Sequence, residues 1–273
     1  MKILTIVVLL TLTVVVFFGT NPVMAAEMTA GEIMELADGR DDGDRSSSDM
    51  KMILIDKRGK ERKRALRSYS LDRGDDVYTL MFFLAPADVK DTGFLTYDYE
   101  AAEKDDDQWL YLPALKKVKR IATSDKTGSF MGSDFSYGDL TKRRPRDYNY
   151  TFHKKQPEAV VYGQKCWVIE SEPKSRKIID ETGYKKSIIF VRQDNLVVVR
   201  AINYLNDNSE VKYFDVKNME QIGGIWTALE IHMTRKKGGK IIHRTILSLE
   251  NVKYNQESVN ETMFSSRRLE KGL

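Results

Sequence analysis

Three histidines and one cysteine are the side chains of this 273-residue sequence best suited to catalysis or metal binding. His153, His232 and His243 lie far apart, and none has the HExxH spacing that presents two imidazoles to one zinc ion. Cys166 lies in VYGQKCWVIES, where a packed strand cysteine is the favoured interpretation. A glycine-rich phosphate loop and a G-x-S-x-G elbow are also missing. We therefore predict a protein that is not an enzyme, with no catalytic residue and no cofactor.

Acidic residues gather at two places where a calcium ion could be considered. Residues 38–44 (DGRDDGD) resemble part of an EF-hand loop, but Arg40 occupies a ligand position and the terminal bidentate glutamate is missing. Asp105, Asp106 and Asp107 are adjacent, and such carboxylates suit a turn because they repel one another in a strand ladder. A solvated linker and a turn are the favoured interpretations, and we predict no metal site.

The first 25 residues have the pattern of an export signal. Lys2 precedes an apolar run over residues 3–18, and Val23, Met24 and Ala25 then offer a cleavage site. A retained membrane anchor is the alternative, but the run is short for a span and no basic stop-transfer segment follows it. We predict cleavage after Ala25, a periplasmic location, and a single domain over residues 26–273.

Charge and cysteine content restrict the partners and the compartment. The formal net charge is +4, and loss of Lys2 with the signal would leave +3. Cations and anions alternate along most segments, which argues against nucleic acid as a partner. Residues 62–67 (RKRALR) form a local basic cluster that could meet lipid head groups, although protection of a strand edge is favoured. One cysteine cannot form an internal disulfide, so stability must come from an apolar core.

The elements that would position any site are mainly strands. Residues 28–37 predict a short amphipathic helix, with Thr29 as N-cap and Glu32 completing a capping box. After the polar linker the pattern becomes a succession of β-rich runs separated by turn residues. The predicted strands are residues 50–57, 62–71, 77–84, 93–99, 108–112, 117–123, 160–170, 185–192, 196–205, 211–219, 225–235 and 241–254.

Alternation and turns predict how these strands assemble. In residues 225–235, Ile225, Thr227, Leu229, Ile231 and Met233 share one face, so the sheet has one dry and one wet side. Residues 193–195 and 237–240 read as hairpin turns, and sequential hairpins form a meander. A sheet of about eleven strands with one dry face curls or closes, which predicts a barrel or half-barrel.

Residues 124–146 interrupt the meander. The segment is rich in Gly, Ser and Asp, yet it carries Phe130, Met131, Phe135 and Tyr137, which need cover. We predict a long loop with a helical turn near residues 137–142, folded over one mouth of the curved sheet. Residues 257–271 have the spacing of a short helix that packs on the sheet through Val259, Met263 and Phe264.

Two motifs carry a family resemblance. DDQWLYLPALKKVKRI (residues 106–121) and GSFMGSDFSY (residues 128–137) are similar to segments of the LolA-like family, in the branch of outer membrane lipoprotein-sorting proteins. The resemblance implies an unclosed β-barrel with helices over its apolar concave face, in a mainly β (α+β) fold. It further implies a periplasmic carrier for a lipid or a lipoprotein acyl chain. Proteins of this branch are often encoded beside inner-membrane exporters of the resistance-nodulation-division (RND) type, which suggests an RND-type transporter as a partner.

Large apolar groups on both faces of several strands indicate either that both faces are covered or that one face lines a cavity. A filled core is the more frequent arrangement, but barrels wider than about eight strands cannot fill their interior with side chains alone, and we therefore predict a cavity. An accessory subunit that docks on an exporter without binding a ligand is the first alternative, and an envelope hydrolase whose histidines converge on acids is the second. We predict Phe130, Met131 and Phe135 as a lid. The predicted cavity wall consists of Leu80, Phe82, Leu84, Phe94, Trp109, Tyr111, Leu229, Ile231 and Met233.

Overall fold

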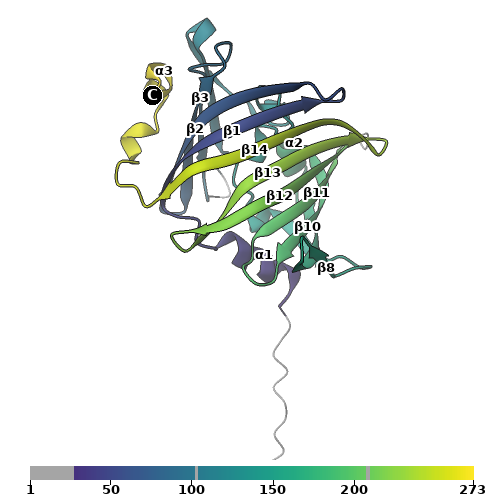
Figure 1. Ribbon diagram of the computed structural model, residues 1–273. Helices are drawn as coiled ribbons and strands as arrows, with labels where there is room; N and C mark the ends of the chain where they lie inside the picture. Colours follow the sequence, from purple (N-terminus) through teal and green to yellow (C-terminus); the bar gives the residue numbers. More distant parts are fainter. Residues whose placement is uncertain (1–27, 102–103, 207–209) are drawn as a thin grey trace, which may run out of the picture.

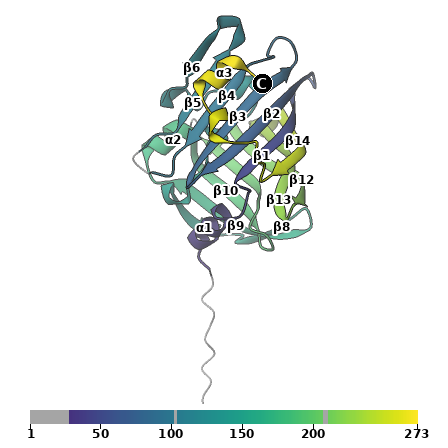
Figure 2. The same ribbon diagram turned by 90° about the vertical axis from the view of Figure 1, so that its left-hand side faces the viewer.

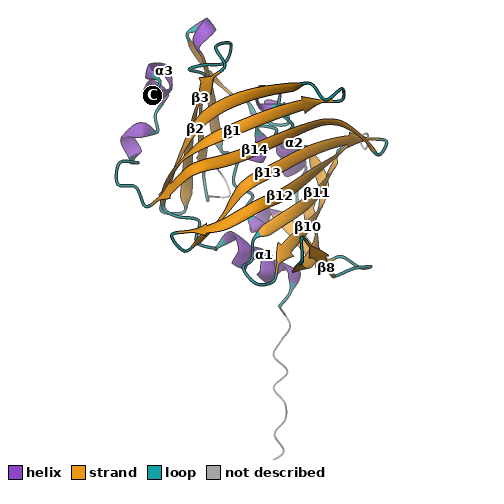
Figure 3. Cartoon of the chain, in the orientation of Figure 1, coloured by secondary structure: helices purple, strands orange, loops and turns teal. Residues whose placement is uncertain are grey.

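The computed structural model describes residues 28–101, 104–206 and 210–273. Most of this chain forms antiparallel strands, accompanied by a few short helices (Figure 3). The predicted export signal at residues 1–25 lies outside the described residues. Within the described ranges, no helix is both long enough and apolar enough to cross a membrane.

Fourteen strands form a single sheet, in the order β6-β5-β4-β3-β2-β1-β14-β13-β12-β11-β10-β9-β7, with β8 paired to β9. Almost every strand pairs with its neighbours in sequence, as a meander requires. The strands are β1 (Arg45–Asp56), β2 (Glu61–Arg73), β3 (Asp76–Ala85), β4 (Gly93–Asp98), β5 (Asp107–Leu112), β6 (Lys117–Arg120), β7 (Tyr148–Phe152), β8 (Glu158–Val161), β9 (Gln164–Pro173), β10 (Tyr184–Arg192), β11 (Val198–Leu205), β12 (Glu210–Ile222), β13 (Ile225–Lys237) and β14 (Lys240–Tyr254).

The sheet curves into an unclosed barrel, which confirms the predicted fold class (Figure 1). The first strand pairs with the last, β1 with β14, so the open edges are β6 and β7. These two strands are consecutive in the sequence. Residues 121–147, which connect them, run into the concave side of the sheet instead of closing the gap. The break in the barrel therefore coincides with the segment predicted to be a lid.

Helix α1 (Ala30–Asp38) closes one end of the concave face. Its capping box is formed as predicted: the backbone N–H of Glu32 donates to Thr29 Oγ1 over 3.2 Å, and the N–H of Thr29 donates to the Glu32 carboxylate over 2.7 Å. This box satisfies N–H groups that the first helical turn leaves unpaired. Ile33 and Met34 are buried in one apolar cluster with Ile169 of β9 and with side chains of β10 and β11.

The other two helices lie on opposite sides of the sheet. Helix α3 (Ser266–Lys271) contacts β4, β5 and β6 on the outer face of the sheet, where Val259, Phe264 and Leu269 are buried (Figure 2). The predicted packing of the tail on the sheet is confirmed. Helix α2 (Arg176–Thr182), which joins β9 to β10, was not expected from the sequence. The predicted turn near residues 137–142 is a 3-10 turn at Gly138–Leu140.

Two hairpin predictions are confirmed, one predicted strand is corrected, and one strand was missed. Gly238 and Gly239 form a two-residue turn with φ values of 55° and 77°, the left-handed conformation that such a turn requires. Residues 193–195 likewise connect β10 to β11. The predicted strand at residues 160–170 is in fact β8 and β9, divided at Tyr162 and Gly163, both with positive φ. Strand β7 was missed because five residues after a proline turn give little periodicity.

Candidate ligand-binding site

The concave face of the sheet carries a continuous apolar wall. Alternate residues of β1 point inward, and the same face continues across β2, β3, β4, β5, β13 and β14. Because alternate strand residues point to opposite faces, the outward side chains of the same strands do not contribute. The buried side chains of this wall are Met50, Met52, Leu54, Leu66, Phe83, Phe94, Leu110, Met233 and Leu247.

Residues 128–138, here called the plug, cover this wall. Phe130 is 1% exposed and Phe135 is 6% exposed, and both belong to the same apolar cluster as the wall. The ring centroid of Phe130 lies 5.0 Å from that of Phe94 and 5.8 Å from that of Phe83. Aromatic rings at these separations attract each other beyond the gain from burial. The predicted lid is thus inserted into the concavity, where it fills the space that an apolar ligand would need.

The plug is a compact unit bonded to itself. At its base, the N–H of Tyr137 donates to the carbonyl of Gly128 over 3.1 Å, and the N–H of Gly138 donates to the carbonyl of Lys126 over 2.8 Å. Higher up, the N–H of Phe130 donates to the carbonyl of Phe135 over 2.8 Å. These bonds satisfy backbone groups that would otherwise be buried without partners.

Glycine is required at the base of the plug. A Cβ atom built on Gly138 would lie 2.5 Å from the carbonyl oxygen of Glu181 in α2, and one built on Gly128 would lie 2.9 Å from the carbonyl of Asp125. Both distances are shorter than van der Waals contact with backbone. Gly138 therefore lets the plug approach α2, and Gly128 lets it fold back against Asp125, which precedes it in the chain.

Polar contacts fix the tip of the plug to the sheet. Asp134, whose side chain is 1% exposed, accepts hydrogen bonds from Thr245 Oγ1 over 2.8 Å and pairs with His243 Nδ1 over 2.6 Å, both on β14. Arg235 of β13 lies 3.8 Å from its other carboxylate oxygen. On β2, the Arg64 guanidinium donates to the backbone carbonyl of Met131. These contacts can break without unfolding the sheet, because none belongs to a strand ladder.

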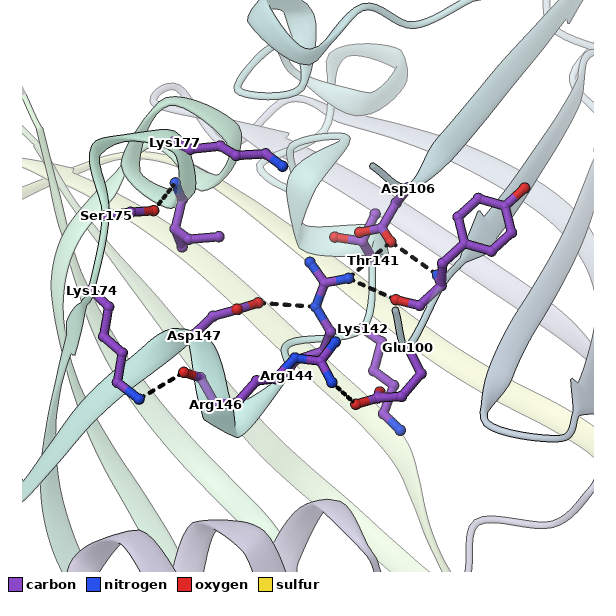
Figure 4. Close-up of polar contacts among 12 residues, drawn as sticks. Glu100, Asp106, Thr141, Lys142, Arg144, Arg146, Asp147, Lys174, Ser175 and Lys177 are labelled. Atoms are coloured by element: carbon purple, nitrogen blue, oxygen red, sulfur yellow. Dashed lines mark hydrogen bonds and ion pairs between the residues drawn. The ribbon is translucent and has the colours of Figure 1, made fainter. Parts of the chain in front are cut away.

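A network of buried charges supports the connection that carries the plug. Arg144 lies between Asp147, 2.9 Å from its Nε, and Asp106, and it also donates to the carbonyl of Tyr99 over 2.7 Å (Figure 4). Burial raises the pKa of Asp106, and burial together with repulsion from Asp106 raises the pKa of Asp98 to about 8. Asp98 is therefore protonated at neutral pH.

The cavity beside this network has a volume of about 130 Å³, lined by residues that include Asp139, Arg143 and Tyr184. Small-molecule sites usually enclose roughly 300–1,000 Å³. Arg144 is held by Asp106, Asp147 and the carbonyl of Tyr99, and we assign the network a structural role. A larger open groove of about 610 Å³ runs between residues 123–127, α2 and the end of β11. The lining of this groove ends at Thr127, just before the plug begins.

The histidines do not converge in the described structure. His153 lies 3.7 Å from Glu170, His232 pairs with Glu230, and His243 pairs with Asp134. Within residues 28–101, 104–206 and 210–273, no group of three or more His, Cys, Asp and Glu side chains could hold a metal ion. Asp38 in the candidate calcium segment faces Lys142 at 3.5 Å.

The structure divides the predicted wall residues between two faces. Phe94, Ile231 and Met233 lie on the concave face, together with the lid residues Phe130, Met131 and Phe135. The face assigned to four others was wrong. These four pack on the convex side, against α3 and the segment before it. On β3, Phe82 and Phe83 point to opposite faces, and Phe83 is the residue that points into the concave face. The four are Leu80, Phe82, Trp109 and Tyr111.

Strand irregularities account for the remaining two predicted wall residues. Leu84 lies where the register of β2 and β3 shifts, and Leu229 lies where that of β12 and β13 shifts. A β-bulge changes the face to which later residues point, so alternation counted along the sequence fails there. Sequence reasoning also missed Met50, Met52 and Leu54. The alternation of Met50, Lys51 and Met52 at the start of MKMILID was the signal that could have identified this face.

The described fold, with its filled apolar concavity, defines an unclosed half-barrel of the LolA-like class. A LolA superfamily protein from Nitrosomonas europaea has the same fold, with a TM-score of 0.65 at 18% identity over 88% of this chain and 99% of that one. A putative outer membrane lipoprotein-sorting protein domain from Vibrio parahaemolyticus is more similar, with a TM-score of 0.77 and 29% identity over 88% and 98%.

Two further matches identify the family to which the chain belongs. A DUF1329 family protein from Desulfovibrio piger has a TM-score of 0.79 and 32% identity, over 88% of this chain and 97% of that one. A family model described as an uncharacterized protein matches residues 75–271. The chain belongs to the DUF1329 family. A search of the curated proteins found no match. The names of the three structural relatives describe sorting or a family, and none names an enzymatic reaction.

Proposed function

We propose that this protein is a non-enzymatic periplasmic carrier that shields a lipid, a lipoprotein acyl chain or a similar apolar molecule on its concave face. The observation that carries the proposal is the plug. A loop that is bonded mainly to itself, and not a strand or a long helix, covers the apolar wall with Phe130 and Phe135. The similarity to a lipoprotein-sorting domain supports the same class of cargo.

The energetics favour exchange of the plug for a long acyl chain. Withdrawing Phe130 and Phe135 from the wall costs about 1.5–3 kcal/mol each in lost burial. Burying an acyl chain returns about 0.8 kcal/mol per methylene, so about eight methylenes offset the loss of both rings. A chain of about sixteen carbons therefore competes successfully, whereas a short apolar molecule does not. The plug would thus select for long chains.

A reversible lock on the plug tests the proposal. Because the N–H of Asp134 donates to Thr245 Oγ1 over 2.9 Å, the double variant Asp134→Cys/Thr245→Cys places two thiols in contact, in a Cys166→Ala background that removes the buried native thiol. The oxidised variant is expected not to take up a fluorescent long-chain fatty acid. Reduction should restore uptake, and each single-cysteine variant serves as a control. Equal uptake by oxidised and reduced protein would show that the ligand does not replace the plug.

A second candidate is supported by the same filled interior. If the plug never leaves the wall, the protein is an accessory subunit of an inner-membrane RND-type exporter and holds no ligand. The locked variant would then bind no fatty acid in either redox state, yet it would still support the cellular function and co-purify with the exporter. A carrier must lose its cellular function when locked.

Export and processing belong to the same proposal. We propose that the signal is removed after Ala25, which leaves residues 26–273 as one domain in the periplasm. The intact mass of protein recovered from the periplasmic fraction tests this. A chain that starts at Ala26 is expected, and a full-length chain that stays with the membrane fraction would contradict it.

A further inference from the structure

Two basic hairpins lie side by side at the mouth of the half-barrel. The first is the β1–β2 connection, residues 56–64, and the second is the β13–β14 connection, residues 235–244. Pairing of Asp56 with His243 and of Ile55 with Arg244 sets the two tips next to each other (Figure 1). Together they are called the basic rim.

The basic rim has a large excess of cations over acids. Residues 56–64 hold six Lys and Arg against two acids, and residues 235–244 hold five against none. The rim therefore carries a formal charge of +9, whereas the whole chain carries +4 and the remainder −5. Ion pairs within the first hairpin engage only Arg58 and Lys63, with Asp56 and Glu61. Such a field attracts an anionic surface and orients the molecule toward it.

The rim also carries an apolar side chain suited to a membrane interface. Ile241 is 47% exposed and follows Lys240 at the tip of the second hairpin. Exposed lysines flank it, and their long aliphatic stems can lie along an apolar surface while the ammonium groups meet phosphate. A projecting hairpin tip with exposed lysines suits a fluid array of head groups better than a protein groove with fixed partners.

The rim is in direct contact with the plug. Arg64, at the end of the first hairpin, holds the carbonyl of Met131, and Arg235 and His243 of the second hairpin face the carboxylate of Asp134. A surface that engages Arg64 and Arg235 with phosphate would withdraw these two side chains from the plug. Docking and opening of the concave face are thereby linked through the same two arginines.

We propose that the basic rim docks the mouth of the protein on an anionic phospholipid surface. Its role in cargo exchange rests on the proposed carrier function, but binding to the bilayer does not. Each cation near an anionic membrane strengthens binding about fivefold at low salt, an effect that ions screen. Binding should therefore be strong at low ionic strength and weak at high ionic strength.

Co-sedimentation with vesicles tests the docking. The triple variant Lys60→Glu/Lys237→Glu/Lys240→Glu changes three exposed rim lysines, and its matched control, Lys154→Glu/Lys155→Glu/Lys165→Glu, changes three exposed lysines at the opposite end of the sheet. Protein purified from the periplasm is mixed with vesicles of phosphatidylcholine, either alone or with about a third phosphatidylglycerol. The rim variant is expected to bind anionic vesicles about a hundredfold more weakly than the control, and neither should bind neutral vesicles.

Equal binding by the two variants, or binding of the unsubstituted protein to neutral vesicles alone, would overturn the proposal. Absence of vesicle binding, combined with capture of an acidic envelope protein that the rim variant loses, would assign the rim to a protein partner and also overturn it. Fatty-acid uptake in solution should be the same in both variants. Vesicle binding without any uptake would refute the carrier function and leave the docking standing.

Discussion

Removal of the Phe130 ring should loosen the plug and strengthen ligand binding at the same time. Phe130 is 1% exposed and contacts the rings of Phe83, Phe94 and Tyr137. Truncation of a buried phenylalanine to alanine costs about 3–5 kcal/mol. The plug is joined to the sheet by side-chain contacts and not by strand pairing, so this cost falls first on its docked state.

A ligand that must displace the plug binds with an affinity reduced by the fraction of molecules in the open state. Weakening the docked state by about 3 kcal/mol raises the apparent affinity by up to about a hundredfold, because about 1.4 kcal/mol corresponds to a factor of ten. The assay is a fluorescence titration of Phe130→Ala with a long-chain fatty acid, accompanied by urea unfolding of the same sample.

Two matched variants separate this effect from a general loss of stability. Phe264→Ala removes a ring that is 4% exposed in the cluster on the convex face, so stability should fall without a change in ligand affinity. Phe94→Ala removes part of the wall itself, so both stability and affinity should fall. The reasoning is refuted if Phe130→Ala binds the fatty acid no more tightly than the unsubstituted protein, or if all three variants change affinity alike.

Three further perturbations have defined outcomes. The pKa of Asp98 is raised from 3.8 in the unfolded chain to about 8 in the folded protein, chiefly by burial and then by Asp106. Its contribution to the free energy of unfolding is therefore complete below pH 3.8 and is lost as the pH rises to 8. As the pH rises from 5 to 8, the free energy of unfolding of Asp98→Asn should increase by at least about 1 kcal/mol relative to that of the unsubstituted protein, as measured by urea unfolding at both pH values. The same difference between the two proteins at pH 5 and pH 8 would contradict the raised pKa. Gly138→Ala should destabilise the protein by about 2 kcal/mol or more, since its new Cβ would meet the carbonyl of Glu181, and thermal unfolding beside Gly31→Ala, a helix position with open space, provides the control. Thr29→Ala should cost about 0.5–2 kcal/mol by removing the N-cap of α1, and limited proteolysis should then cut near this helix first.

Local patterns in the sequence were sufficient to predict that the chain forms a sheet of antiparallel strands. The Gly238-Gly239 turn, the Thr29 capping box and the alternation of Leu247 and Leu249 each depend on neighbours within a few residues, and the structure contains all three. The direction in which each side chain of a strand points was harder to predict. Strand β3 reads YTLMFFLA, with large apolar groups at successive positions, so periodicity alone cannot decide whether Phe82 or Phe83 points inward. Only the position of α3 on one side and the plug on the other distinguishes them.

The sequence predicted that the plug folds over the sheet but not that it fills the interior, and the difference follows from topology. Residues 121–147 connect β6 to β7, the two edges of the sheet, so they must cross the gap that those strands leave open. A connection in that position can pass over the mouth or enter the concavity. Entry is favoured here because Phe130 and Phe135 have no comparable apolar partner outside the wall, while Asp134 reaches Thr245 and His243 only from inside. Exposing an apolar concavity of this width to water would cost free energy in proportion to its apolar area. The same chain segment that breaks the barrel supplies the side chains that cover this area.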